Sequence, residues 1–511
     1  MKWLCVGFCL WSIPSLALAD ASGLKEARQR WLHGNYEEAR ELYQAAAKEP
    51  NQHDTAIIGV SRTWESQGEY DKALEVVDVA LKEQAKSADL LGRRAEVLYL
   101  RGRWEEAEKS AASAIDLKKD QLPARWVRAQ IYRDRGEIKK ADLEFRWFVH
   151  HYNDADVKDP DSLLLIGLAG CENARWNSIA DQFEFILNEV YADALKAEKD
   201  FWPAEYESGA LLLEKYKSGD ALDAFDKTLT INPKSTQALV GKGIAALQKF
   251  EIKDAERLAE RALKVNPRYP EALHLRADVH LAGSEVPEAM KELETARQVN
   301  PRDESTLGRI AACFFLQRKA DELKKLIQEV EQRDAKPGLF YFVLANQLDE
   351  RRRYDDAEKF YKKSMELWPQ LPWAENSLGL LYMRMGREKE AQTILTKAFE
   401  ADPFNVRVSN ALKVLHHLEK YASMKTDHFE LRYDPAHDKF LVRYLAKYLE
   451  EIYGELTQKF NYQPKEKILI EVFNTHDMFS GRVVSLPDLH TIGACTGRMI
   501  AMVSPRGKGI A

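Results

Sequence analysis

A fixed period of 34 residues limits what this chain can fold into more than any other feature of its sequence. Glycines recur at this spacing near the N-terminus, namely at Gly34, Gly68, Gly102 and Gly136. An alanine follows each of them five residues later, at Ala39, Ala73, Ala107 and Ala141. Self-similarity at one period indicates a small structural unit that repeats along the chain. We therefore expect a repeat array over this part of the protein.

The same period returns in the middle of the chain with a different marker. Prolines keep this spacing, or twice it, at Pro233, Pro267, Pro301, Pro369 and Pro403. Between Ala141 and Ala221 the spacing is irregular, which leaves room for one unit lengthened by a polar insert from Asn153 to Ser162. The period predicts about eleven units between Ala21 and Pro403.

The residue types in each unit suit a pair of antiparallel helices. Small residues let two helices approach closely, and large apolar residues fill the space between neighbouring units. A glycine ends the first helix where a positive φ is tolerated, and a proline follows the second helix. The last full unit carries the most complete set of such residues, at Leu378, Gly379, Tyr382, Gly386, Ala391, Ala398 and Pro403. In this set the chain resembles the tetratricopeptide repeat family, which implies an α-helical solenoid.

In that family the first helix of each unit lines the concave face, and binding belongs to this face. Register with Ala141 places Trp126, Gln130 and Arg133 there in the fourth unit. The corresponding positions of other units hold Arg28, Trp31, Arg62, Glu65, Tyr206, His274, Asp278, Phe342 and Asn346. This mixture predicts a groove for a protein or peptide partner, with an ordinary packed or solvated role as the alternative for each residue. The repeated basic set with which family members clamp a C-terminal carboxylate is missing.

The first residues have the layout of a cleavable secretory signal. An apolar stretch from Trp3 to Ile13 follows Met1-Lys2, and the small-residue pattern Ala17-Leu18-Ala19 precedes Asp20. We predict a signal peptide over residues 1–19 and a secreted or periplasmic protein of the bacterial cell envelope. The alternative is a short N-terminal anchor helix. No later apolar run is long enough to span a membrane, and a net charge of −6 offers no basic surface for nucleic acid.

After the last repeat the pattern changes to that of an α/β lobe. Residues from Val406 to Ala422 predict a helix that caps the open end of the array. The period changes to two from His428, which predicts a strand, and strands are also predicted from Ile468 to Phe473 and from Arg498 to Val503. Between the first two strands, helical spacing predicts one broad apolar face made of Leu441, Tyr444, Leu445, Tyr448, Leu449, Ile452, Tyr453, Leu456 and Phe460.

Three segments of this lobe carry a second resemblance. They are His428-Phe429, Ile470 to Phe473 and Gly493 to Met502, and together they are similar to the N-terminal sheet of gluzincin-type (peptidase MA-like) zinc metallopeptidases. In that family the strand before the zinc helix is a sheet edge that pairs with an extended substrate. The resemblance assigns this role to Met499, Ile500, Ala501, Met502 and Val503.

The zinc site of that family requires the motif HExxH and a third ligand downstream. None of the twelve histidines lies in such a motif. We therefore expect no catalytic residue, no metal ligand and no cofactor in this chain. Zinc is expected only if an HExxH motif follows residue 511.

The predicted fold class is mainly α, a solenoid of about eleven helix pairs followed by a small, incomplete α/β lobe. The predicted segments are a signal peptide (1–19), a first block of the array (20–152), a second block that begins with the irregular unit (153–403), a capping helix (404–424) and a partial peptidase-like domain (425–511). Two functions fit this organisation. The chain is an exported scaffold that binds a protein or peptide, or it is the N-terminal portion of a zinc-dependent metallopeptidase.

Overall fold

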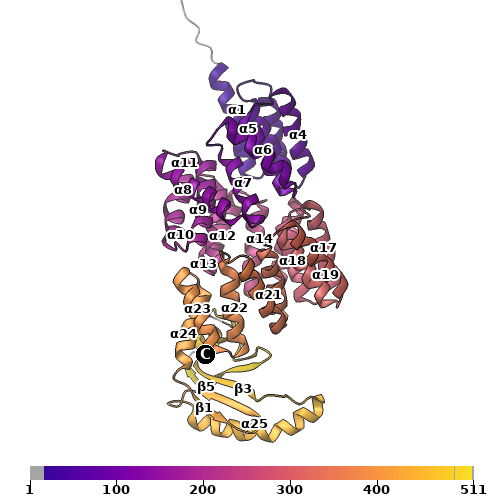
Figure 1. Ribbon diagram of the computed structural model, residues 1–511. Coiled ribbons are helices and arrows are strands. Elements are labelled where there is room, and N and C mark those ends of the chain that lie inside the picture. Colours follow the sequence, from indigo (N-terminus) through magenta and orange to yellow (C-terminus); the bar gives the residue numbers. More distant parts are fainter. Residues whose placement is uncertain (1–15, 488, 509–511) are drawn as a thin grey trace, which may run out of the picture.

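Eleven helix pairs follow one another in the residues that the computed structural model describes, 16–487 and 489–508 (Figure 1). The first five are α1 (Leu16–Leu32) and α2 (Tyr36–Ala46), α3 (His53–Ser66) and α4 (Tyr70–Glu83), α5 (Ala88–Leu100) and α6 (Trp104–Leu117), α7 (Leu122–Asp134) and α8 (Ile138–Asp154), and α9 (Pro160–Asn177) with the continuous stretch α10 (Asp181–Phe185), η1 (Ile186–Val190) and α11 (Tyr191–Ala197). The other six are α12 (Trp202–Glu214) and α13 (Ser218–Ile231), α14 (Thr236–Gln248) and α15 (Ile252–Val265), α16 (Pro270–Ala282) and α17 (Val286–Val299), α18 (Glu304–Leu316) and α19 (Ala320–Arg333), α20 (Gly338–Glu350) and α21 (Tyr354–Leu367), and α22 (Pro372–Met385) and α23 (Glu388–Ala401). The predicted solenoid is confirmed.

Most of the predicted signal peptide, residues 1–15, lies outside the described part of the chain, so that segment stays a prediction. Within the described residues, no helix combines the length and the apolar character that crossing a bilayer requires. The repeat alanines Ala39, Ala73, Ala107 and Ala141 are fully buried at the helix crossings. This burial agrees with the packing role that the period predicted for them.

The polar insert of the fifth unit lengthens helices instead of forming a long loop. Helix α8 continues to Asp154, and α9 starts at Pro160. The Asp159 side chain caps α9 by accepting a hydrogen bond from the backbone N–H of Ser162 at 2.8 Å. The insert therefore places the acidic start of α9 at a defined position inside the array.

Successive turns of the superhelix touch along an inter-turn seam, formed by Gly34, Gly68 and Gly102 on one side and Asn232, Asn266 and Asn300 on the other. Each glycine packs against the asparagine 198 residues further on, so one superhelical turn takes about six units of 34 residues. The Asn232 amide donates a hydrogen bond to the Tyr36 hydroxyl at 3.2 Å, and Asn266 repeats this contact with Tyr70 at 3.2 Å. The array therefore stacks on itself.

The seam explains the glycines better than backbone conformation does. Gly68 has a φ of +79°, but Phe250 and Arg318 occupy the same turn position in later units with φ values of +62° and +58°. A positive φ alone therefore does not require glycine at this turn. A Cβ atom at Gly34, Gly68 or Gly102 would overlap the side-chain oxygen of the facing asparagine.

The capping helix is α24 (Val406–Leu418), which ends earlier than the predicted Ala422 because the chain turns into a strand that the sequence reading missed. The lobe that follows contains β1 (Ala422–Lys425), β2 (Phe429–Tyr433), α25 (Lys439–Phe460), β3 (Ile468–Thr475), α26 (His476–Val484), β4 (Gly493–Cys495) and β5 (Met499–Lys508). The sheet order is β1-β2-β3-β5-β4, with β2, β3 and β5 parallel and with β1 and β4 antiparallel to their neighbours.

Two expectations about this lobe are wrong. The segment Met499 to Val503 is not a sheet edge, because β4 pairs with Ile500 to Met502 and forms the outer strand itself. The predicted apolar face of α25 is only partly buried, since Tyr444 and Phe460 are 78% and 69% exposed. The predicted Tyr453 and the unpredicted Val442 are buried against the sheet, with Leu441, Leu445 and Leu449 packed beside them, so the buried face is narrower than the helical spacing suggested.

A buried ionic network fixes the lobe to the last repeat, at the end of the molecule opposite α1 (Figure 1). The fully buried Arg482 of α26 donates hydrogen bonds to Glu471 of β3 at 2.6 Å and to Glu388 of α23 at 2.7 Å. It also donates to the Met383 carbonyl at 2.7 Å. One guanidinium therefore joins the sheet, the short helix and the repeat array.

Candidate peptide-binding cavity

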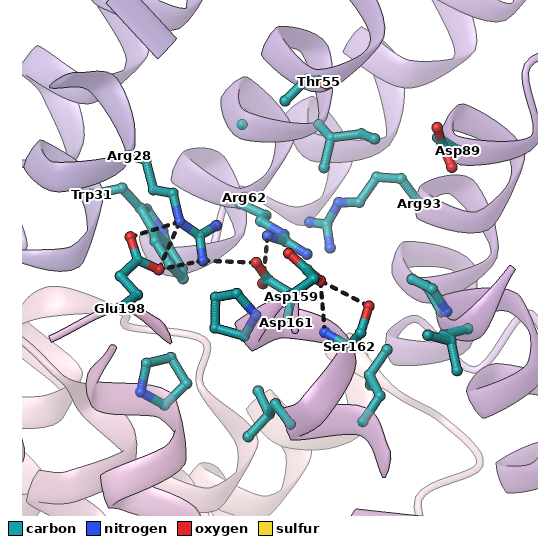
Figure 2. A pocket seen from close by; sticks show the side chains of 18 of the residues that line it. Arg28, Trp31, Thr55, Arg62, Asp89, Arg93, Asp159, Asp161, Ser162 and Glu198 are labelled. Carbon is teal, nitrogen blue, oxygen red and sulfur yellow. Dashed lines mark hydrogen bonds and ion pairs between the residues drawn. The ribbon is translucent and has the colours of Figure 1, made fainter. Parts of the chain in front are cut away.

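The first superhelical turn surrounds a cavity of about 1080 Å³ that is partly open to solvent. Figure 2 shows side chains of α1, α3, α5 and the start of α9 on its walls, and α12 contributes further lining residues. Apolar and aromatic side chains contribute part of the lining, namely Leu24, Trp31, Ile58, Leu164, Leu165, Trp202 and Tyr206. The inner faces of these helix pairs thus become the walls of a cavity.

Paired charges hold this turn of the superhelix closed. Figure 2 shows the Arg28 guanidinium between Glu198 and Asp161, at 2.7 Å from an oxygen of each. Asp161 also pairs with Arg62 at 3.1 Å. Arg28 comes from unit one, Asp161 from the lengthened unit five and Glu198 from the connection to unit six, so the network joins the two ends of the turn.

The carboxylate of Asp161 stays ionised in this network. Burial by itself would raise the pKa of the Asp161 carboxyl, but the guanidinium groups of Arg62 and Arg28 outweigh burial and hold that pKa below its usual value. Burial by itself would also lower the pKa of Arg28. The negative charges of Asp161 and Glu198 outweigh the effect of burial and raise that pKa above its usual value. Each charge is therefore compensated by a partner of opposite sign.

A second, smaller cavity of about 280 Å³ adjoins the first. It is lined by Trp126, Arg133, Leu168, Cys171, Glu172, Arg175, Tyr191, Glu207, Ala210, Leu211, Glu214 and Trp373. Glu207 also lines the larger cavity, so this side chain borders both spaces. In the described part of the chain, no three histidine, cysteine, aspartate or glutamate side chains converge as the ligands of a metal ion would.

The residues predicted for the groove fall into two groups. Arg28, Trp31, Arg62 and Tyr206 line the larger cavity, and Trp126 and Arg133 line the smaller one. Both residues of the second pair also have structural contacts, because Trp126 packs on Phe145 and Phe148 and Arg133 pairs with Asp134 at 2.9 Å.

The remaining groove predictions lie outside both cavities. Gln130 is half-buried, while His274 is buried and lies 2.7 Å from the Thr306 hydroxyl. Asp278 accepts hydrogen bonds from Arg309 at 2.8 and 3.0 Å. Phe342 packs on Tyr361 and Trp373, and Asn346 accepts a hydrogen bond from Tyr361 at 3.3 Å. The last four of these side chains have partners within the chain. The role of all five in binding stays a prediction.

Three carboxylates are among the cavity residues that register along the repeat missed. Asp161 belongs to the polar insert, and Glu198 lies in the connection between α11 and α12, where the period has no counterpart. Glu207 follows the predicted Tyr206 by one position on α12. The only local signal was Asp159-Pro160, which is typical of a helix start and places Asp161 in the first turn of α9.

Comparison with known proteins supports the repeats directly. Models of the tetratricopeptide repeat match residues 31–97, 240–304 and 350–415. The chain contains tetratricopeptide repeats. These matches lie in both turns of the superhelix, and the last of them extends through α23 into α24.

Two solved structures match parts of the chain. The crystal structure of yeast Tom70 is 15% identical, covers 78% of this chain and 89% of its own, and has a TM-score of 0.37. The structure of YrrB, described as a tetratricopeptide repeat protein with an unusual peptide-binding site, is 18% identical, covers 36% of this chain and 96% of its own, and has a TM-score of 0.25. Superpositions this loose establish neither a common curvature nor a common ligand. No curated protein sequence matches the chain significantly.

Proposed function

We propose that the chain is a scaffold whose first superhelical turn binds an extended segment of another protein. The observation that carries this proposal is the partly open cavity of about 1080 Å³, lined by aromatic, aliphatic and charged side chains. Small-ligand pockets usually hold only a few polar groups, whereas this cavity is lined by many charged side chains beside its apolar ones and is partly open to solvent, which suits a stretch of polypeptide. Tyrosine, tryptophan and arginine side chains are also the residues that dominate protein recognition.

A bulky side chain at Thr55 tests the proposal. Thr55 is exposed on the cavity wall of α3, so Thr55→Trp should fill part of the cavity and leave the helix pair intact (Figure 2). We expect a peptide selected from a library of random nonapeptides on the unmodified chain to bind the variant about tenfold more weakly or worse. Fluorescence anisotropy with the labelled peptide measures this change.

The matched control places the same side chain on the outer helix of the same unit. Glu75 is exposed on α4 and does not line either cavity, so Glu75→Trp should leave the affinity unchanged. Equal affinity of the Thr55→Trp variant and the unmodified chain would place binding elsewhere on the solenoid.

We further infer that the scaffold is exported and that its lobe is the first part of a metallopeptidase-like domain. Support comes from the signal layout of residues 1–19 and from a mixed sheet in which the short outer strand β4 runs antiparallel to β5. In such a domain an extended substrate would pair with β4, not with the covered strand β5. An HExxH motif downstream of residue 511 in the coding sequence would support the peptidase proposal, and a stop codon there would end it.

A further inference from the structure

Glu207 is a carboxylate without a partner that lines both cavities. It lies half-buried on α12 and lines both cavities, yet it makes no hydrogen bond or ion pair within the described residues. Asp161 and Glu198 are paired with arginines in the larger cavity, and Glu172 and Glu214 are paired with Arg175 in the smaller one. Among the carboxylates named here, Glu207 is therefore the one whose charge no arginine or lysine compensates.

The cations near Glu207 are already engaged. Arg175 lies 3.0 Å from Glu172 and also pairs with Glu214, and Arg133 pairs with Asp134 at 2.9 Å. The titratable groups that face Glu207 from the surrounding helices are Arg133 of α7, Cys171, Glu172 and Arg175 of α9, Tyr191 of α11, Tyr206 and Glu214 of α12, and, near the start of α16, Tyr269 and Glu271. None of these supplies a free positive charge to Glu207.

Burial without a partner changes the acidity of this group. Removal from water raises the pKa of Glu207 to about 7, and the distant charge of Arg175 offsets this only in part. Near neutral pH the carboxyl group is therefore divided between its two protonation states. A cation entering the cavity would favour the ionised form and would lower the pKa again.

We propose that the two cavities recognise a positively charged side chain, lysine or arginine, of the bound peptide, and that Glu207 is its partner. The inference rests on the proposed function, since it names the chemistry of the segment that the cavity holds. Trp126 and Trp373 line the smaller cavity beside Glu207, and tryptophan rings attract cations in addition to packing on the aliphatic part of a long side chain. The free carboxyl group, the aromatic lining and the cavity fit one cationic side chain.

Selection of peptides tests the proposal with a defined probe. Random nonapeptides with an acetylated N-terminus and an amidated C-terminus are selected on the full chain at pH 8, where Glu207 is ionised. We expect lysine or arginine to be enriched on the unmodified chain and not on Glu207→Gln. A selected peptide should bind Glu207→Gln about tenfold more weakly, because a charge-assisted hydrogen bond is lost.

Two controls separate recognition from folding. Glu205 lies on the same helix, pairs with Lys227 at 3.0 Å and lines neither cavity, so Glu205→Gln should bind like the unmodified chain. The second control is the unmodified chain itself, whose affinity for the selected peptide should fall as the pH is lowered from 8 to 6 and Glu207 gains a proton. Glu207→Gln should show no such pH dependence.

Each outcome decides one of the two proposals. The role of Glu207 is overturned if the selected peptides show no preference for lysine or arginine, or if they bind Glu207→Gln as tightly as the unmodified chain. Either result leaves the proposed peptide site standing. The selection is then repeated with peptides that have a free N-terminus. Peptides without lysine or arginine whose binding depends on Glu207 would overturn the proposed side-chain partner in favour of an amino terminus. Failure of any peptide to bind the cavity, judged with Thr55→Trp, overturns the proposed function.

Discussion

Replacing Arg482 with methionine should release the C-terminal lobe from the repeat array and lower the free energy of unfolding of that lobe by about 3 kcal/mol or more. Methionine keeps much of the length of the side chain, but it cannot donate to Glu471, Glu388 or the Met383 carbonyl. Glu471 is fully buried, so the change leaves an ionised group in the core with only Arg432 nearby, at 3.4 Å. An uncompensated buried charge costs far more than the pair contributes.

The positions of the tryptophans allow the two parts to be followed separately. The last tryptophan of the chain is Trp373 in α22, so tryptophan fluorescence reports on the array and not on the lobe. Hydrogen exchange of the amides in β3 and β5 reports on the sheet. We expect Arg482→Met to abolish slow exchange in these strands while the fluorescence transition in urea changes little.

Two further variants show whether charge causes the effect. Arg443 is exposed on α25, so Arg443→Met should leave the lobe stable. The double variant Arg482→Met with Glu471→Gln removes the uncompensated charge and should recover part of the lost stability. If the amides of β3 and β5 exchange as slowly in Arg482→Met as in the unmodified chain, the apolar contacts of α26 are sufficient to keep the lobe folded.

Alanine at the three seam glycines should separate the two superhelical turns. At Gly34, Gly68 and Gly102 the new Cβ atom would overlap the facing asparagine, and the positive φ adds strain. Each substitution should lower the free energy of unfolding by roughly 2–4 kcal/mol, from overpacking together with the left-handed conformation. Small-angle X-ray scattering of the triple variant should show a larger radius of gyration, and urea unfolding gives the cost of each single change.

Gly386 provides the matched control for the seam. It has a φ of +73°, like the seam glycines, but a Cβ atom there would lie 3.4 Å from Leu469, in ordinary contact. Gly386→Ala should therefore cost about 1 kcal/mol, which is the strain of the backbone alone. Equal losses at Gly386 and Gly68 would mean that the turn conformation, and not the inter-turn contact, selects glycine.

The sequence predicted the binding cavity only in part. Arg28, Trp31, Arg62 and Tyr206 could be found because the period places them on the inner face of successive units. Glu207 could not be singled out, because its importance depends on the absence of a nearby cation, and the arginines around it come from helices α7 and α9. A missing partner has no signature in the local sequence.

In the C-terminal lobe, too, the sequence predicted the elements but not all of their contacts. Strand β4 has three residues, too few for an alternating pattern, and without it β5 was taken for the sheet edge. On α25, helical spacing identified the apolar residues but not which of them the sheet covers, so Tyr444 was assigned to the apolar face although it is exposed. Periodicity identifies an element, while burial depends on what the element packs against.

By itself the sequence determined that this chain is a series of helix pairs, because each 34-residue unit contains the small, apolar and turn residues that pair its own two helices. The tertiary structure alone decided how the pairs curve, stack and enclose space. Gly68 meets Asn266, and Arg28 meets Glu198, across separations of 198 and 170 residues. Contacts at such distances arise from the angle between successive units, summed over a whole turn, and no single unit encodes that sum.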